Sequence, residues 1–118
     1  MGSGKILASR IAGRDRAPAD GPHFDDINPA TGEVICSVAA ADAALVNEAV
    51  AAARQAQREW FALPAAERGR VLARVAAILR ERKQELARLE VLDTGKPIQE
   101  APEADIGSAA DCLSSSQG

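Results

Sequence analysis

A stripe of apolar residues at helical spacing, ending on an acid, constrains this chain more than any other feature. Counting back from Asp93 in steps of three and four gives Leu89, Leu86, Arg82, Leu79, Val75 and Leu72. Such a stripe marks the buried face of a long amphipathic helix. A bend is expected at 81–83, because no apolar residue occurs between Leu79 and Leu86. The pattern predicts helix here and places Asp93 on the buried face.

The position of Asp93 is electrostatically unfavourable for a negative charge. It lies in the last turn before Gly95, where helical carbonyl groups point outward and disfavour an anion. A buried carboxylate at such a place needs a cation or several hydrogen-bond donors. In one interpretation Asp93 caps the helix end by bonding nearby backbone donors or Lys96. In the other it is a ligand for a bound monovalent cation, and spacing alone favours the first.

A β-hairpin is predicted ahead of the helices, from Phe24 to Val38. Asn28–Gly32 (NPATG) supplies the turn, with proline fixing φ and glycine free to take positive φ. The residues after it favour extended structure. Cys36 lies in that strand and is interpreted as a small buried apolar residue, since nothing nearby in the sequence would activate its thiol.

Two further helical segments, and the start of the helix that carries the stripe, follow from the pattern. Asp42 is a candidate N-cap for a helix to about Phe61, with one side formed by Val46, Ala49, Val50, Ala53, Ala56 and Trp60. Pro64 suits the start of the next helix. After Pro97 another helix is expected, interrupted by Pro102, with an apolar side formed by Ile106, Ala109, Ala110 and Leu113. Residues 1–23 are poorly defined, with a short strand entering a turn at 10–14, and residues 114–118 form a polar tail that we expect to fray.

Composition narrows the function classes. The 118 residues carry a net charge of -3 with 47% hydrophobic residues, so no basic surplus suggests nucleic acid and no apolar run suggests a membrane span. Without a secretion signal, Cys36 and Cys112 are expected to be reduced thiols in a cytoplasmic chain. His23 is interpreted as solvated or capping. No motif in the sequence performs chemistry unaided, so no catalytic or cofactor-binding residue is assigned.

Four short motifs carry a resemblance to a known family. FDDINPATGEVI, W-x-x-LP-x-x-ER, LE-x-LDTGKP and EADIGSAADCL occur in that order between Phe24 and Leu113. This region resembles the N-terminal portion of the aldehyde dehydrogenase superfamily. LDTGKPIQE and ADCL are most similar to its betaine aldehyde dehydrogenase and aminoaldehyde dehydrogenase branch.

The resemblance implies an α/β parent with a Rossmann-like cofactor domain, a catalytic domain and a small bridging sheet. The segment itself, by pattern, is mostly α-helical with an N-terminal β-hairpin, and residues 24–113 would be an incomplete part of the cofactor domain. The family reaction is NAD- or NADP-dependent oxidation of an aldehyde to an acid, through a cysteine thiolate and a glutamate-activated water. A homo-oligomer, dimer or tetramer, is implied as well.

The resemblance also implies site residues. In betaine-aldehyde-like members potassium is held by backbone oxygens and an aspartate, and the matching positions here are Asp26, Ile27 and Asp93. It shifts the balance for Asp93 toward the cation interpretation. Ala104 and Ser108, one helical turn apart, match the wall of the aldehyde channel. Neither Cys36 nor Cys112 matches the motif of the nucleophile.

Where the family continues with aromatic residues, this chain has SSSQG. We therefore expect a truncated product, a fragment or an altered reading frame past Leu113, which would be inactive alone. Two alternatives are a non-catalytic module that packs on full-length subunits and an independently folded helical domain.

Overall fold

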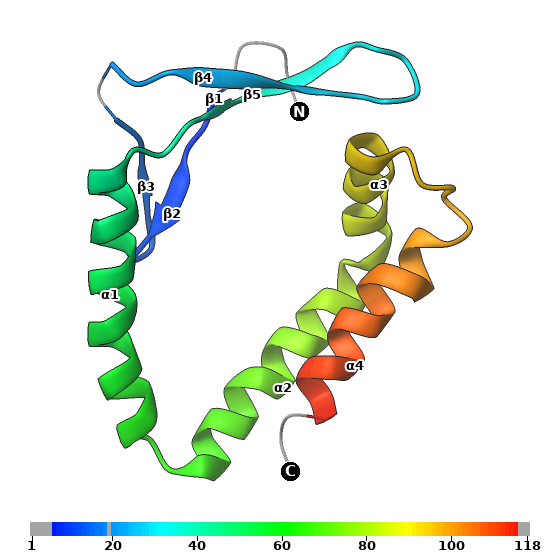
Figure 1. The fold of residues 1–118 in the computed structure, drawn as a ribbon. Coiled ribbons are helices and arrows are strands. Elements are labelled where there is room, and N and C mark those ends of the chain that lie inside the picture. Colours follow the sequence, from blue (N-terminus) through cyan, green and yellow to red (C-terminus); the bar gives the residue numbers. More distant parts are fainter. Residues whose placement is uncertain (1–5, 19, 116–118) are drawn as a thin grey trace. The chain divides into compact units, whose positions relative to one another are not determined.

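The computed structural model describes residues 6–18 and 20–115, which belong to two compact units, Met1–Ala62 and Leu63–Gly118. The first unit contains the strands β1 (Ile6–Leu7), β2 (Ser9–Ile11), β3 (Arg14–Arg16), β4 (His23–Ile27) and β5 (Val34–Ala39), followed by helix α1 (Ala43–Ala62). The second contains α2 (Ala65–Glu81), α3 (Lys83–Thr94), the π-helical segment η1 (Ala101–Gly107) and α4 (Ser108–Ser115). Figure 1 labels the strands and the α-helices.

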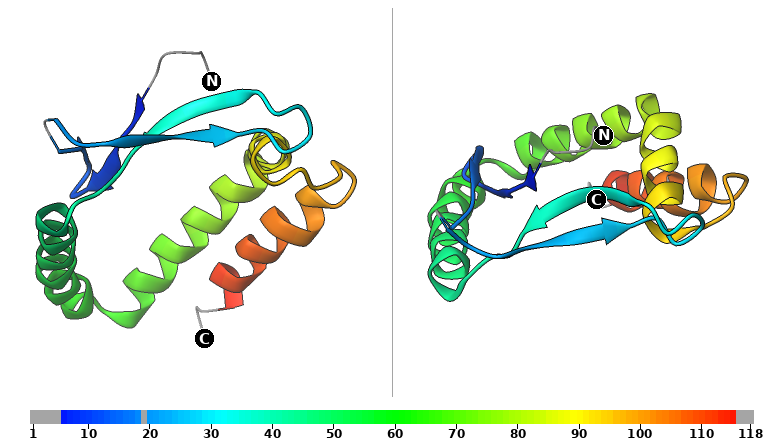
Figure 2. Two further views of the ribbon diagram at one scale, coloured as in Figure 1. Left: turned by 45° about the horizontal axis from the view of Figure 1, so that its top comes forward. Right: turned by 90° about the horizontal axis from the view of Figure 1, so that it is seen from above.

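The predicted hairpin is confirmed as the antiparallel pair β4–β5 (Figure 2). Its turn closes because the Asn28 N–H donates to the Glu33 carbonyl and the Gly32 N–H donates to the Asn28 carbonyl, both at 2.8 Å. The Asn28 side-chain oxygen accepts from the Ala30 N–H at 2.9 Å, which is an Asx turn. Gly32 has φ +75°, the left-handed conformation that glycine adopts without strain.

Two small sheets are formed by the described strands. One has the order β1-β5-β4, with β1 parallel to β5, and the other is the β2–β3 hairpin. The β2–β3 turn has positive φ at both Ala12 and Gly13, as a tight two-residue hairpin turn requires. The strand entering a turn that was expected at 10–14 is therefore confirmed.

Helix α1 begins where the sequence predicts. Asp42 caps it, because its Oδ1 accepts the Leu45 N–H at 2.8 Å. Leu45 is buried together with Ile11 and Cys36, and these three are the buried apolar residues of the described part of the first unit. The predicted apolar side of α1 is only partly covered, since Val46 and Val50 are 52% and 48% exposed.

The second unit is a set of packed helices with a core of alanines. The predicted bend is confirmed at Arg82 (φ -99°, ψ 16°), which separates α2 from α3. Helices α2 and α4 lie side by side, and α3 packs against η1 (Figures 1 and 2). The fully buried residues of these contacts are Ala76, Ala87, Ala101 and Ala110.

The predicted burial of Asp93 is wrong: this residue is exposed, and Leu89 is 40% exposed. The prediction counted through Arg82 as though the helix were continuous, whereas the bend gives α3 its own buried face, centred on Ala87. Asp93 follows Ala87 by six residues, or about 240° around the helix. It therefore points away from the packed side.

The predicted interruption at Pro102 is also wrong. Pro102 lies in the first turn of η1, where its missing N–H costs little, and the helix continues through α4. Ala110 and Leu113 lie on the packed side of α4 as expected, but Ala109 is exposed. Ser114 and Ser115 complete α4 rather than fraying, while residues 116–118 lie outside the described residues. Among the described residues, none of the helices combines the length and the apolar character that a membrane span requires.

Candidate functional site

The first part of the candidate cation site lies at the end of β4. Asp26 is opposite Cys36 and Ile27 is opposite Val34, so the pairing shifts by one residue between Asp26 and Ile27. Such a bulge locally disrupts the ladder and re-aims groups next to it. Asp26 is partly buried and Ile27 is 44% exposed. A carboxylate and backbone carbonyl oxygens are hard donors, which is the chemistry that an alkali or alkaline-earth cation prefers.

Asp93, the other predicted ligand, belongs to the second unit. The described residues give its carboxylate no hydrogen bond or ion pair, so the predicted cap with Lys96 is absent from them. Lys96 binds Asp105 instead. Within residues 6–18 and 20–115, no group of three or more His, Cys, Asp or Glu side chains is arranged to hold a metal ion.

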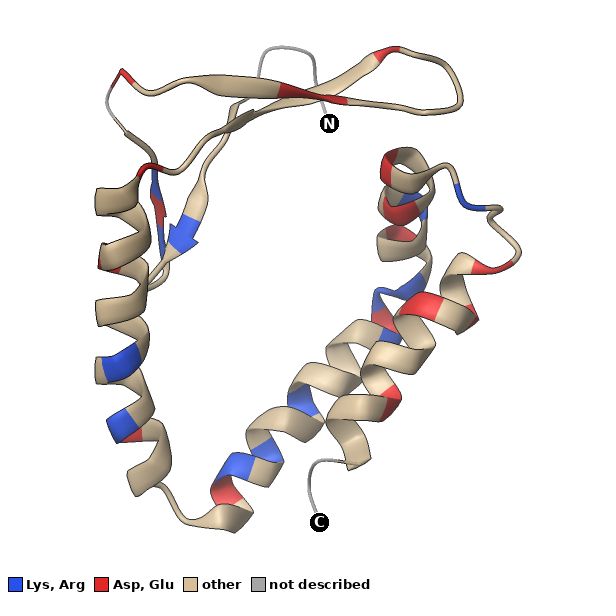
Figure 3. Ribbon diagram, in the orientation of Figure 1, with Lys and Arg blue, Asp and Glu red and all other residues tan. Residues whose placement is uncertain are grey.

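A pair of lysine clamps joins α3 to η1 in the second unit. Lys96 Nζ donates to both carboxylate oxygens of Asp105 at 2.8 Å, and Lys83 Nζ donates to Glu103 Oε1 at 2.6 Å. Figure 3 shows the Lys/Arg and Asp/Glu positions of this region on α3, η1 and the loop between them. The hydrogen bonds that Lys96 donates to Asp105 raise the pKa of Lys96 above its ordinary value. Partial burial opposes this rise, and the charges of Asp105, Glu90 and Glu100 add to it.

These clamps were not predicted. The lysine and the acid of each clamp lie 9 or 20 residues apart in the chain. Local spacing rules detect pairs three or four residues apart. The signal that could have indicated the Lys96 pair is a lysine just past the helix-ending Gly95, followed by an acid-rich helical segment.

The two residues predicted for a channel wall lie on this clamped segment. Ala104 is in η1 and Ser108 begins α4, and both are exposed. Their positions are thus fixed by the same elements that Lys83 and Lys96 hold.

The two cysteines differ in environment. Cys36 is 2% exposed in β5, which confirms its interpretation as a buried apolar residue, whereas Cys112 is exposed on α4. His23, at the start of β4, is exposed as expected.

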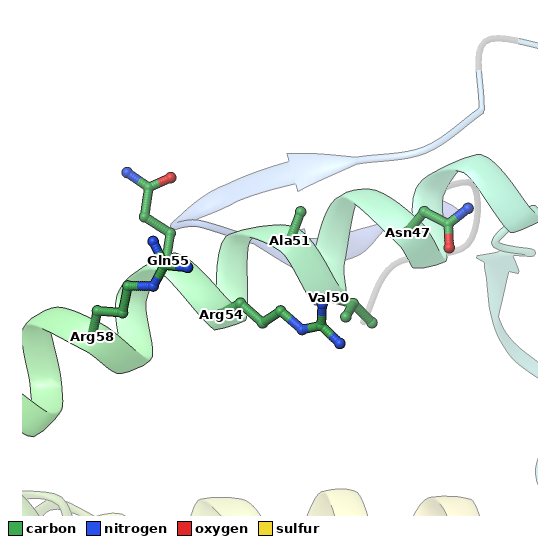
Figure 4. A pocket seen from close by; sticks show the side chains of 6 residues that line it. All are labelled: Asn47, Val50, Ala51, Arg54, Gln55 and Arg58. Carbon is green, nitrogen blue, oxygen red and sulfur yellow. The ribbon is translucent and has the colours of Figure 1, made fainter.

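A surface hollow of about 610 Å³ lies along α1 (Figure 4). The described residues that line it all come from α1: Asn47, Val50, Ala51, Arg54, Gln55 and Arg58. Because these residues supply one helix face and no opposing wall, they do not form an enclosed ligand pocket.

Comparison with known proteins identifies the family of the chain. Residues 16–118 match the aldehyde dehydrogenase family. The chain belongs to that family, as its motifs indicated.

Particular relatives are similar to it. It is 54% identical to a betaine aldehyde dehydrogenase of Rhizobium etli (strain CIAT 652) over 95 residues, which cover 80% of this chain and 20% of that protein. Among solved structures it resembles a putative aldehyde dehydrogenase from Burkholderia cenocepacia (42% identity, TM-score 0.87, covering 92% of this chain and 22% of the other). It also resembles PnpE in complex with nicotinamide adenine dinucleotide (41% identity, TM-score 0.88, covering 92% and 22%). The chain thus spans about a fifth of the length of these relatives, and the expected α/β dehydrogenase fold is confirmed for the part that it covers.

Proposed function

We propose that this chain is the N-terminal part of an NAD(P)-dependent aldehyde dehydrogenase that oxidises a betaine-aldehyde-like substrate to its acid. The observation that carries the proposal is the 54% identity to betaine aldehyde dehydrogenase over four fifths of the chain. That relative's name supports the substrate class, and the NAD-bound structure of a similar protein supports the cofactor class. We also propose that the full-length enzyme is a cytoplasmic homo-oligomer, either a dimer or a tetramer.

The contribution of this part is scaffolding. The support for this role is the sequence, because neither Cys36 nor Cys112 occupies the motif of the family's nucleophile. We propose that the nucleophilic cysteine, the general-base glutamate and the main NAD(P) contacts come from the remaining four fifths of the family's fold. The 118-residue chain alone is then inactive.

Asp26, Ile27 and Asp93 are proposed as potassium ligands. Two observations support this proposal. The β-bulge lies between Asp26 and Ile27, and Asp93 is exposed, so its carboxylate is accessible to a cation. Ala104 and Ser108 are proposed for the channel wall, supported by their exposure on one connected helical segment.

A chimaera tests the proposed function directly. In the Rhizobium etli betaine aldehyde dehydrogenase, the matching N-terminal fifth would be replaced by residues 16–113 of this chain. The chimaera should fold and reduce NAD with betaine aldehyde, while the 118-residue chain alone should yield no NADH above a blank. A well-folded chimaera without activity would refute the assignment, and turnover by the chain alone would refute the scaffold role.

A second candidate function is a non-catalytic module that packs on full-length subunits. The observation that favours it is the set of exposed apolar side chains, which includes Phe24 (57%) and Phe61 (79%). Co-elution of the tagged chain with the full-length relative would support it, and failure to co-elute at micromolar concentration would exclude it.

A further inference from the structure

Both ends of α3 are tied to η1 by a lysine. Lys83 is the first residue of α3 and binds Glu103, while Lys96 follows the helix-ending Gly95 and binds Asp105. Glu103 and Asp105 are the acidic residues of η1. The Lys96–Asp105 pair is sheltered on both sides, with 32% and 27% of the two side chains exposed. Since both oxygens of Asp105 accept from one ammonium, the pair fixes direction as well as distance.

Gly107 makes room for one of these clamps. A Cβ built at Gly107 would lie 3.3 Å from Glu103 Oε2 and 3.4 Å from the Pro102 carbonyl oxygen. The first distance is tighter than ordinary van der Waals contact. The Glu103 carboxylate therefore lies over a position that is kept free of a side chain.

The winding of η1 needs such support. A π-helix has poorer packing than an α-helix and is rare beyond a single turn, so it persists where tertiary contacts hold it. Here the segment spans seven residues, from Ala101 to Gly107. Rewinding this segment as α-helix would shift the register by one residue. Side chains on the two sides of the shift would then rotate relative to each other by about 100°.

The downstream end is held as well. Arg80 of α2 donates to Asp111 Oδ1 and to Ser114 Oγ of α4, both at 3.0 Å. Helix α4 is thereby fixed on α2 while η1 is fixed on α3. Because both neighbouring contacts are fixed, a change in the winding of η1 must alter the backbone of the segment that carries Ala104 and Ser108.

We propose that Lys96, with Lys83, is a positioning residue that keeps η1 in its π-helical winding and so sets the orientation of Ala104 relative to Ser108. The clamp itself rests only on the contacts above. Its consequence for an aldehyde channel rests on the proposed function of Ala104 and Ser108.

Hydrogen–deuterium exchange on the complete 118-residue chain tests the clamp without any activity assay. Lys96→Met should accelerate exchange of the backbone amides of 104–107 several-fold, because it removes both bonds to Asp105. Lys96→Arg should restore protection. The matched control is Arg82→Met, which removes a bidentate pair between the residue at the α2–α3 bend and Glu85 of α3 and deletes no contact to η1.

Orientation is measured separately by thiol labelling. In a Cys112→Ser background, Ala104→Cys and Ser108→Cys would each be labelled with and without Lys96→Met, and the ratio of the two labelling rates should change several-fold. An unchanged ratio together with unchanged exchange would overturn the proposal. Equal acceleration by Arg82→Met would overturn it too, since the effect would then be general loosening.

A variant that fails to fold does not end the test. Lys83→Met removes the other clamp, the bond to Glu103 Oε1, and it should accelerate exchange in η1 more than in α2. Uniform exchange across both elements in Lys83→Met would count against the clamp. If the chimaera folds without activity while Lys96→Met still accelerates exchange in η1, the dehydrogenase assignment is refuted and the clamp is not.

Discussion

Lys96 Nζ lies 2.8 Å from each carboxylate oxygen of Asp105, nine residues further along the chain. Between them α3 ends at Gly95, which has φ +75° and donates its N–H to the Val91 carbonyl. The chain then returns to pack η1 on α3. One ammonium thus closes the connection that brings two helical elements together.

Removal of this ammonium should lower stability in a pH-dependent way. Asp105 raises the folded-state pKa of Lys96 above its ordinary value of 10.5, so the contribution is fully present below that pH and is lost as pH rises through the higher folded value. The denaturation midpoint of Lys96→Met should fall below wild type at neutral pH. The difference should shrink at strongly alkaline pH, and a constant difference would contradict the mechanism.

The ion pair between Arg16 and Glu48 joins β3 to α1 through two bonds, at 2.9 and 3.0 Å. Hydrogen bonding from Arg16 lowers the pKa of Glu48 below its ordinary 4.5. Its stabilisation is present above that value and is lost as pH falls through the lower folded value. In an NMR titration, Arg16→Ala should return the Glu48 pKa upward, whereas Arg10→Ala should leave it unchanged.

Loss of the α1 cap should be measurable. Asp42→Ala removes the acceptor of the Leu45 N–H and should cost about 1 kcal/mol in free energy of unfolding. Asp42→Ser keeps a capping oxygen and should recover most of it. Urea denaturation of the three proteins decides the matter, and an equal loss in Asp42→Ser would show that charge rather than capping is responsible.

The hairpin turn should be sensitive to backbone strain alone. Gly32 has φ +75° and open space around its Cα, so Gly32→Ala meets no neighbour yet adopts a disfavoured conformation, at a cost of about 1 kcal/mol or more. Gly32→Asn should be milder, because asparagine tolerates this region. Thermal melts would compare them, and a neutral Gly32→Ala would be inconsistent with this turn.

Enlargement of the α2–α4 contact should be costly. Ala76 of α2 is fully buried, and α2 packs against α4, so Ala76→Leu forces overpacking that typically costs about 1–3 kcal/mol. Ala77→Leu is the control, since Ala77 is exposed in the same helix. Equal stability of the two variants by denaturant titration would contradict the packing described.

Local chemistry was predictable from the sequence. The turn of β4–β5, the Asp42 cap and the bend at Arg82 each depend on a few adjacent residues, and all three are confirmed. Family membership was likewise readable, because its motifs occur in order at fixed spacing.

Two kinds of feature were not predictable: the face of a helix that follows a bend, and contacts between residues far apart in the sequence. The face of Asp93 was wrong because a bend resets the helical phase, and the clamps on η1 were missed because their partners are brought together by tertiary folding. The pattern predicts a break at Pro102, whereas the structure has this proline in a first helical turn, where proline fits. The relation of Asp26 and Ile27 to Asp93 stays a prediction, since the residues belong to separate units.

Among the described residues of the second unit, the four that are fully buried are all alanines: Ala76, Ala87, Ala101 and Ala110. Alanine scanning, the usual survey of energetic importance, would pass over each of them unchanged. It would report sensitivity only at the larger residues around them, several of which, such as Val75 and Leu89, are 40% exposed. A scan by enlargement, with valine or leucine at every alanine, is the survey that would map where this half of the chain holds together.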